Sequence, residues 1–193
     1  MNAHNDGTKI HFDTPEAAGN MFPFFPDVHG APFDPIKAAS HLTRWTVDMA
    51  SNSDEFESRE RLSEMVGEFP RIDDRYAGRK YRHGWMLGFG GPQRSSIGHV
   101  DLETGKTSVW DAGPRKVVQE PTFIPRRPDA REGEGWIATA ATNTETLLTE
   151  LLLLEATDIA KGPVATIRTP LHMKPAYHGN WFDGSLIRAS GLV

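Results

Sequence analysis

The sequence predicts an all-β protein, and two observations carry this prediction. Short runs in which apolar and polar residues alternate recur along the 193 residues, without the βαβ spacing of a parallel sheet. Glycine and proline are frequent, with 18 and 14 residues, and they are spread along the chain. This composition favours many short elements joined by tight turns over a few long helices.

The expected strands follow one another along the whole chain. Residues 9–13 alternate, and residues 42–49 (LTRWTVDM) alternate with β-branched and aromatic side chains, as a half-buried strand does. Further strands are expected at 80–89, 96–102, 107–110, 123–124, 135–141, 150–155 and 164–169. Residues 146–156 could form a helix on propensity alone. A strand is favoured there because a turn and another alternating run follow.

One hairpin indicates the type of β fold. Residues 101–110 (DLETGKTSVW) resemble the D-x-x-T-G-x hairpin common in propeller blades, and residues 154–165 look like a weaker variant. Two or three four-stranded blades fit the chain length, whereas a closed propeller has about 4–8 blades. So few blades would leave an open apolar face and unpaired strand edges. We therefore expect residues 1–193 to be part of one larger propeller domain, and to associate or dissolve poorly when expressed alone.

Composition excludes several classes of protein. The net charge is −5 and no long cluster of lysine and arginine exists, which argues against a nucleic-acid partner. The longest apolar run, residues 151–154, is far short of the roughly 20 residues of a membrane-spanning helix. The first residues lack the features of a secretory signal, so a cytoplasmic location is expected. Cysteine is absent, so any metal must be held by His, Asp, Glu or backbone oxygen atoms.

The residues that could carry chemistry occur in short motifs. None of the eight histidines lies in an H-E-x-x-H arrangement, and nucleophile-elbow, Walker and G-x-G-x-x-G motifs are absent. Five motifs follow one another: EFPRID (68–73), GRKYR (78–82), EPTFIPR (120–126), EGEGW (132–136) and HGNW (178–181). In this order and spacing they resemble the C-terminal half of the carotenoid cleavage oxygenase family. Residues 10–13, 20–27 and 44–49 are more similar to its lignostilbene dioxygenase branch.

The resemblance implies a fold and a metal site. The family fold is a seven-bladed β-propeller, of which this chain would form about the last three blades. Four histidines hold Fe(II) on its axis, and a few glutamates hydrogen-bond to some of them. His178 matches the fourth iron ligand, and Glu68 and Glu120 match two of the glutamates. Neutral imidazole suits Fe(II), and a carboxylate on its second nitrogen fixes tautomer and orientation.

Two aromatic residues are expected to line the substrate cavity by the same resemblance, namely Phe22 and Tyr177. Each residue also has an ordinary structural interpretation. The aromatic residues could be plain core, the glutamates solvated turn carboxylates, and most histidines surface or hydrogen-bonded structural side chains.

The implied reaction is the cleavage of a conjugated alkene with O₂ into two carbonyl products, without an organic cofactor. The expected substrate is a phenolic stilbene or another lignin-derived alkene, with an apocarotenoid as the alternative. Asn2-Ala3 resembles the end of the family's H-x-x-N-A motif, so the third histidine would precede Met1, and the first two would lie further upstream. The chain alone is then expected to be inactive, with the missing N-terminal blades as its partner. The alternative is a non-catalytic propeller fragment that serves as a binding or assembly module.

Overall fold

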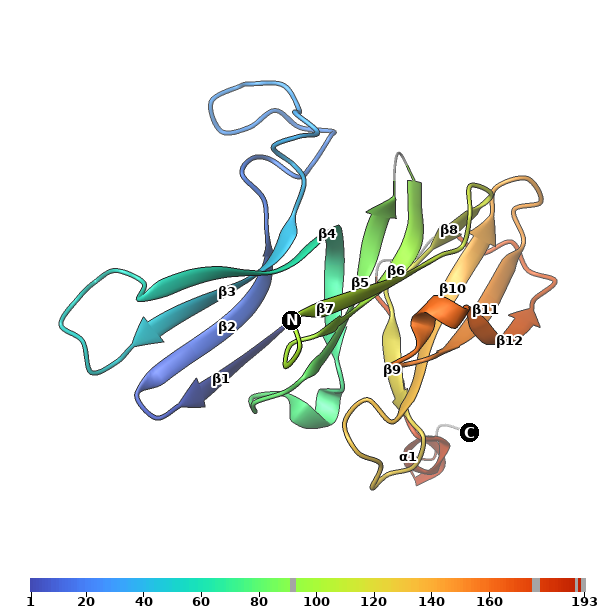
Figure 1. Cartoon of the computed structure of the whole chain (residues 1–193). Helices are drawn as coiled ribbons and strands as arrows, with labels where there is room; N and C mark the ends of the chain where they lie inside the picture. Colours follow the sequence, from blue (N-terminus) through green and yellow to red (C-terminus); the bar gives the residue numbers. More distant parts are fainter. Residues whose placement is uncertain (91–92, 175–177, 190, 192–193) are drawn as a thin grey trace.

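The structure, a computed structural model, describes residues 1–90, 93–174, 178–189 and 191. Within this part of the chain, strands dominate and helices are short (Figure 1). The strands are β1 (Asn2–Asp6), β2 (Lys9–Glu16), β3 (His41–Asp48), β4 (Ser58–Ile72), β5 (His83–Gly90), β6 (Gln93–Asp101), β7 (Lys106–Asp111), β8 (Lys116–Val118), β9 (Thr122–Pro125), β10 (Gly135–Asn143), β11 (Thr149–Glu155) and β12 (Pro163–Arg168). The helical elements are the 3₁₀ turns η1 (Asp74–Tyr76) and η2 (Ile159–Lys161) and the helix α1 (Gly184–Ala189). The all-β prediction is confirmed.

The strands form three antiparallel units. In the first sheet, strands β1 to β7 pair in sequence order. The second sheet has the order β12-β11-β10-β8, and β9 also pairs with β10. The first part of β4 pairs with β3, whereas its end, from Gly67 to Ile72, pairs with β5. β4 therefore closes one four-stranded unit and opens the next. The first unit is therefore β1 to β4, the middle unit β4 to β7, and the third the five-stranded sheet of β8 to β12; side by side in Figure 1, they fit a partial propeller.

Several elements differ from the sequence-based expectations. β11 covers residues 149–155 as a strand, so the helical alternative for this segment is wrong. β1, β4 and β8 were not expected, because their sequences lack clear alternation, and the six-residue helix α1 was not expected either. β1 (NAHND) is polar, yet it pairs residue for residue with β2 across a turn at Gly7, whose φ of 62° suits glycine. Cross-strand pairing, rather than local pattern, decides these strands.

Both faces of the middle unit are buried. Successive side chains of a strand point to opposite faces, so neighbouring residues of β5 belong to different core clusters. Trp85 and Leu87 of β5 pack with Ile137 of β10 and Leu154 of β11 in the larger core cluster. Met86, between them in sequence, packs on the other face with a smaller cluster that includes Leu42 and Val100. These contacts join the three units into one body.

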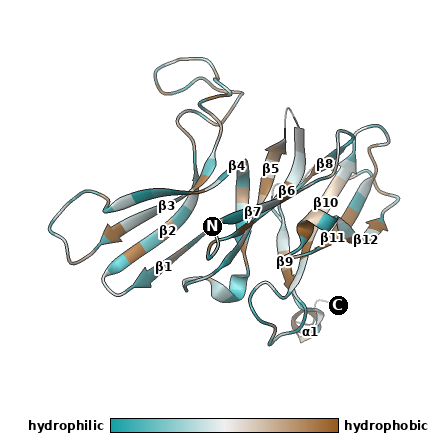
Figure 2. Cartoon of the chain, viewed as in Figure 1, coloured by the Kyte–Doolittle hydropathy of each residue, from teal (hydrophilic) through white to brown (hydrophobic). Residues whose placement is uncertain are grey.

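The outer faces of the first and third units are less covered. On the first unit, Phe12, Trp45 and Phe56 form an aromatic cluster, with ring centroids 4.6–6.5 Å apart. On the third unit, Leu151 and Ile167 remain 42% and 53% exposed. Figure 2 shows hydrophobic and hydrophilic stretches following one another along β2 and β3, as expected for strands with two different faces. None of the helices in the described part of the chain is long and apolar enough to cross a membrane.

Candidate functional site

Glu120 and His178 come together near the end of the chain. Glu120 lies between β8 and β9, and residues 178–183 return to this position before α1. Glu120 Oε1 lies 3.5 Å from His178 Nδ1, and Glu120 Oε2 accepts a hydrogen bond of 3.0 Å from the Gly179 N–H. The Glu120 side chain is only 6% exposed, whereas that of His178 is 74% exposed. A buried carboxylate therefore faces one ring nitrogen of an accessible histidine.

Arg71, near the end of β4, completes this arrangement. Its Nη1 lies 3.2 Å from Glu120 Oε2 and donates a hydrogen bond of 2.9 Å to the Gly179 carbonyl oxygen. Its Nη2 lies 3.4 Å from an Asp74 carboxylate oxygen. The guanidinium compensates the buried charge of Glu120, which would otherwise be costly.

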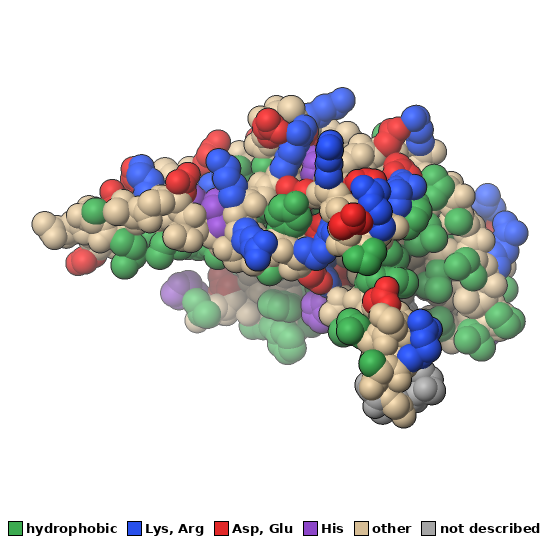
Figure 3. All heavy atoms as spheres, turned by 90° about the horizontal axis from the view of Figure 1, so that it is seen from below, with side chains coloured by type: hydrophobic (Ala, Val, Ile, Leu, Met, Phe, Trp, Pro, Cys, Tyr) green, Lys and Arg blue, Asp and Glu red, His purple; other side chains and the backbone are tan. Residues whose placement is uncertain are grey.

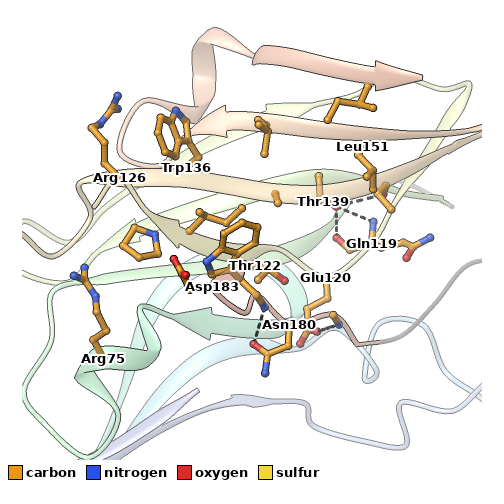
Figure 4. Close-up of a pocket in the computed structure, with 18 of the residues that line it drawn as sticks. Arg75, Gln119, Glu120, Thr122, Arg126, Trp136, Thr139, Leu151, Asn180 and Asp183 are labelled. Carbon is orange, nitrogen blue, oxygen red and sulfur yellow. Dashed lines mark hydrogen bonds between the residues drawn. The ribbon is translucent and has the colours of Figure 1, made fainter. Parts of the chain in front are cut away.

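A cavity of about 1120 Å³ adjoins this cluster. Its apolar wall comes from β10, β11 and β12 and includes Trp136, Leu151 and Ile167. Figure 4 shows Trp136 and Leu151 on this side of the cavity and Glu120 and Asn180 on the other. In Figure 3 the C-terminal segment stands off from the body of the molecule, and hydrophobic side chains gather beside it.

The wall of the cavity is the outer face of the third unit. Along β10, Ile137 and Ala141 are buried in the core cluster, whereas the alternate residues Trp136, Ala138 and Ala140 line the cavity. This is the alternation of a strand whose two faces both contact apolar surroundings. Arg126 also lines the cavity, and its guanidinium lies over the Trp136 ring, 4.6 Å from the ring centroid.

The other residues expected at the site lie in different places. Glu68 is half-buried on β4 and pairs with Leu87 of β5. The next residue, Phe69, has a ring centroid 5.5 Å from that of His178. Phe22 is 65% exposed in the loop between β2 and β3, and it is not among the residues that line the cavity. Tyr177 lies outside the described residues.

The residues present fit one metal ligand rather than a whole metal site. A carboxylate accepts hydrogen bonds, so its position beside Nδ1 favours the His178 tautomer with the proton on that atom. Nε2 then carries the lone pair that a metal ion needs. Across the described residues, no three or more His, Asp or Glu side chains are grouped so that they could hold a metal. Further ligands would have to come from elsewhere.

A histidine pair in the middle unit was missed by the sequence analysis. His83 Nδ1 and His99 Nε2 are 3.0 Å apart, and both side chains are buried beside Trp85. Burial lowers the pKa of His83, and burial together with the neighbouring His83 lowers the pKa of His99 to about 4. An alignment of β5 with β6 could have suggested the pair. In this register His99 is opposite Trp85, which is two residues along β5 from His83.

A second buried polar group joins the first and middle units. The Asp13 carboxylate accepts two hydrogen bonds of 2.8 Å from Arg44 and another from the Tyr81 hydroxyl. Burial, followed by the Asp13 charge, raises the pKa of Tyr81 well above its usual range. The nearby His4 is buried, and its Nδ1 has no hydrogen-bond partner among the described residues. The group is structural in character, because it ties β2 and β3 to the segment before β5.

Comparison with known proteins finds a matching family model, curated relatives and similar solved structures. The family model described as RPE65, retinal pigment epithelial membrane protein, matches residues 1–183. A lignostilbene-α,β-dioxygenase isozyme III from Sphingomonas paucimobilis is 44% identical over 96% of this chain and 40% of its own length. The crystal structure of Pseudomonas brassicacearum lignostilbene dioxygenase has a TM-score of 0.87 and 37% identity over 94% of this chain and 40% of that one.

A more distant structure extends the comparison. Cobalt-substituted Synechocystis ACO, an apocarotenoid oxygenase, has a TM-score of 0.80 and 26% identity over 94% of this chain and 38% of that one. The chain thus spans about 40% of the length of the curated relatives it matches.

Proposed function

Because the chain belongs to the carotenoid oxygenase family, we propose that it forms the C-terminal part of a non-haem iron(II) dioxygenase that cleaves a conjugated carbon–carbon double bond with O₂ into two carbonyl products. The observation that carries this proposal is the Glu120 carboxylate beside His178 Nδ1. A carboxylate in this position orients a metal-binding imidazole and raises its basicity. His178 is the proposed iron ligand.

Iron, when bound, would supply the activation of O₂. The residues of this chain do the rest of the proposed work. His178 would present Nε2, while Glu120 keeps the proton on Nδ1. Glu68, on the same strand as Arg71, is proposed to orient another ligand histidine from outside this chain. Phe22 and Tyr177 stay proposed contacts of the substrate.

The proposed substrate is a phenolic stilbene or another lignin-derived alkene. The relative with 44% identity is a lignostilbene dioxygenase, whereas the apocarotenoid oxygenase structure is only 26% identical. An apocarotenoid is therefore the second candidate.

The remaining blades of the propeller are the proposed partner of this chain. In a closed propeller each blade packs on two neighbours. The aromatic face with Phe12 and Trp45 and the cavity wall with Trp136 and Leu151 lie on opposite outer units, as two such packing faces would. We propose that both faces are covered in the complete enzyme, and that the isolated chain neither retains iron nor turns over substrate.

A chimera tests this proposal. The 193 residues would replace the matched 40% of the Sphingomonas paucimobilis lignostilbene dioxygenase. Iron content by mass spectrometry and aldehyde release from a hydroxystilbene would be measured. The expected result is one iron per chain and measurable cleavage. His178→Ala should abolish both, and Glu120→Gln should weaken iron binding about 10–100-fold, as loss of an outer hydrogen-bonding partner does.

His29→Ala is the matched control, because His29 is exposed and lies in the loop between β2 and β3. It should leave iron content and cleavage unchanged. A folded chimera without iron would refute the dioxygenase proposal and favour a non-catalytic propeller module. Stoichiometric iron with turnover in the isolated 193-residue chain would refute the proposed inactivity.

A further inference from the structure

Arg71 holds a position that the proposed ligand set leaves unexplained. Its side chain is 20% exposed and reaches from β4 to two other segments, the Glu120 turn and residues 178–179. It also lies beside Asp74 of η1. One guanidinium therefore joins the end of β4 to two segments that are far from it in sequence, at Glu120 and at Gly179.

The contacts of Arg71 close a loop around Gly179. The Gly179 N–H donates to Glu120 Oε2, the Gly179 carbonyl accepts from Arg71 Nη1, and that nitrogen is 3.2 Å from the same carboxylate oxygen. Both polar groups of Gly179 are thus held by one ion pair. With Oε2 engaged in this way, Oε1 is left facing His178 Nδ1.

The backbone of β4 is distorted just where it sets the direction of Arg71. In a regular strand, residues 68 and 71 would point to opposite faces. The pairing with β5 shifts register between Glu68 and Arg71, and Phe69 within the shift has a φ of 49°. A left-handed conformation is unfavourable for a residue other than glycine. Strain of this kind persists where the surrounding structure requires it.

We propose that Arg71 is a positioning residue that, together with Glu120, fixes the backbone of Gly179, and through it the preceding His178 ring, against Glu120. Its significance for iron rests on the proposed function, whereas the positioning itself does not. An arginine suits the task because its planar donors reach a carboxylate and a carbonyl together. A hydrogen bond to a charged group is also stronger than one between neutral groups.

The test uses the full 193-residue chain and two NMR measurements: hydrogen exchange of the Gly179 amide and the ring ¹⁵N shifts of His178. Arg71→Met should speed Gly179 exchange at least about tenfold, the loss expected for a charge-assisted hydrogen bond. The same variant should move the His178 ring shifts. Arg71→Lys keeps the charge and a donor but loses the planar geometry, so its Gly179 exchange rate should lie between those of Arg71→Met and the original chain.

Arg75→Met is the matched control. Arg75 also binds a buried carboxylate, that of Asp73, and two backbone carbonyls, those of Pro128 and Ala130, but it does not contact Glu120. It should lower global stability without moving the His178 shifts. Should Arg71→Met fail to fold, Arg71→Gln, which retains a neutral donor, carries the same comparison.

Two results would overturn the positioning role: unchanged Gly179 exchange in Arg71→Met, or an equal change in Arg75→Met. The proposed function fails separately. If the chimera with His178→Ala keeps its iron, His178 is no ligand, while the exchange comparison still decides the role of Arg71.

Discussion

The buried pair His83–His99 makes the stability of this protein sensitive to mild acid. His99 is 5% exposed, and burial with the neighbouring His83 lowers its pKa from the ordinary 6.5 to about 4. The unfolded chain therefore takes up a proton at a pH where folded His99 remains neutral. Since the unfolded state binds more protons, stability falls as the pH falls from the unfolded pKa toward the folded one. The loss is complete once the pH is below about 4.

The magnitude follows from these two pKa values. Between about pH 7 and pH 5, the difference in proton binding at His99 lowers the free energy of unfolding by about 2 kcal/mol. The lowered pKa of His83 acts in the same direction. The carboxylate of Asp101, whose pKa Arg82 holds below its usual range, acts only at lower pH.

The perturbation is His99→Gln, which keeps a hydrogen-bonding side chain but removes the titration. Urea unfolding followed by tryptophan fluorescence, at about pH 7 and pH 5, would give the free energy of unfolding of both chains. The variant is expected to lose about 2 kcal/mol less than the original chain over this interval. His29→Gln, at an exposed histidine, is the control and should leave the pH dependence unchanged. Equal pH dependence in His99→Gln and the original chain would refute the reasoning.

Three further predictions concern stability and use the same urea assay. Leu154→Ala should destabilise the chain by about 2–5 kcal/mol, because Leu154 is fully buried, whereas Leu151→Ala on the open face should cost less than about 1 kcal/mol; similar losses would contradict the assigned faces. Tyr81→Phe should cost about 1–2 kcal/mol, because it removes a donor from the buried Asp13 carboxylate, and no measurable loss would mean that water or Arg44 replaces the hydroxyl. Leu147→Asn should stabilise the chain by about 0.5–1 kcal/mol, because Leu147 is exposed with a φ of 58° that asparagine tolerates better; a loss of stability would show that the leucine side chain makes needed contacts.

The fold was predictable where the local pattern reflects one buried face. β3, β5, β10 and β11 alternate or carry apolar runs, and each matches an expected strand. β4 escaped prediction because it changes partner midway. Its first residues, Ser58–Arg61, are exposed and polar or charged, so they have no apolar face for a pattern to detect. β1 is equally polar and depends on its pairing with β2.

The site was predictable as far as its members stand in motifs. Glu120 was expected to hydrogen-bond to one of the ligand histidines and His178 to be such a ligand, and the structure brings these two side chains within 3.5 Å of each other. Arg71 stands in the same EFPRID motif as Glu68, yet its contacts with Glu120 and Gly179 could not be foreseen. They depend on the register shift and on the φ of Phe69, which no periodicity encodes. His83 and His99 were missed for a related reason, since they meet across strands.

The electrostatics of the Glu120 cluster fit a site with one imidazole in this chain. Burying the Glu120 carboxylate beside the partly exposed Arg71 guanidinium carries a desolvation cost. The attraction between the two charges and their hydrogen bonds to both polar groups of Gly179 offset that cost, and the same hydrogen bonds order the backbone next to His178. Order of that kind would serve the proposed ligand role of His178, because a metal site tolerates little displacement of its donors. The ion pair beside the His178 imidazole is consistent with the proposed ligand role; the iron measurements test that role, and the exchange measurements test the positioning by Arg71.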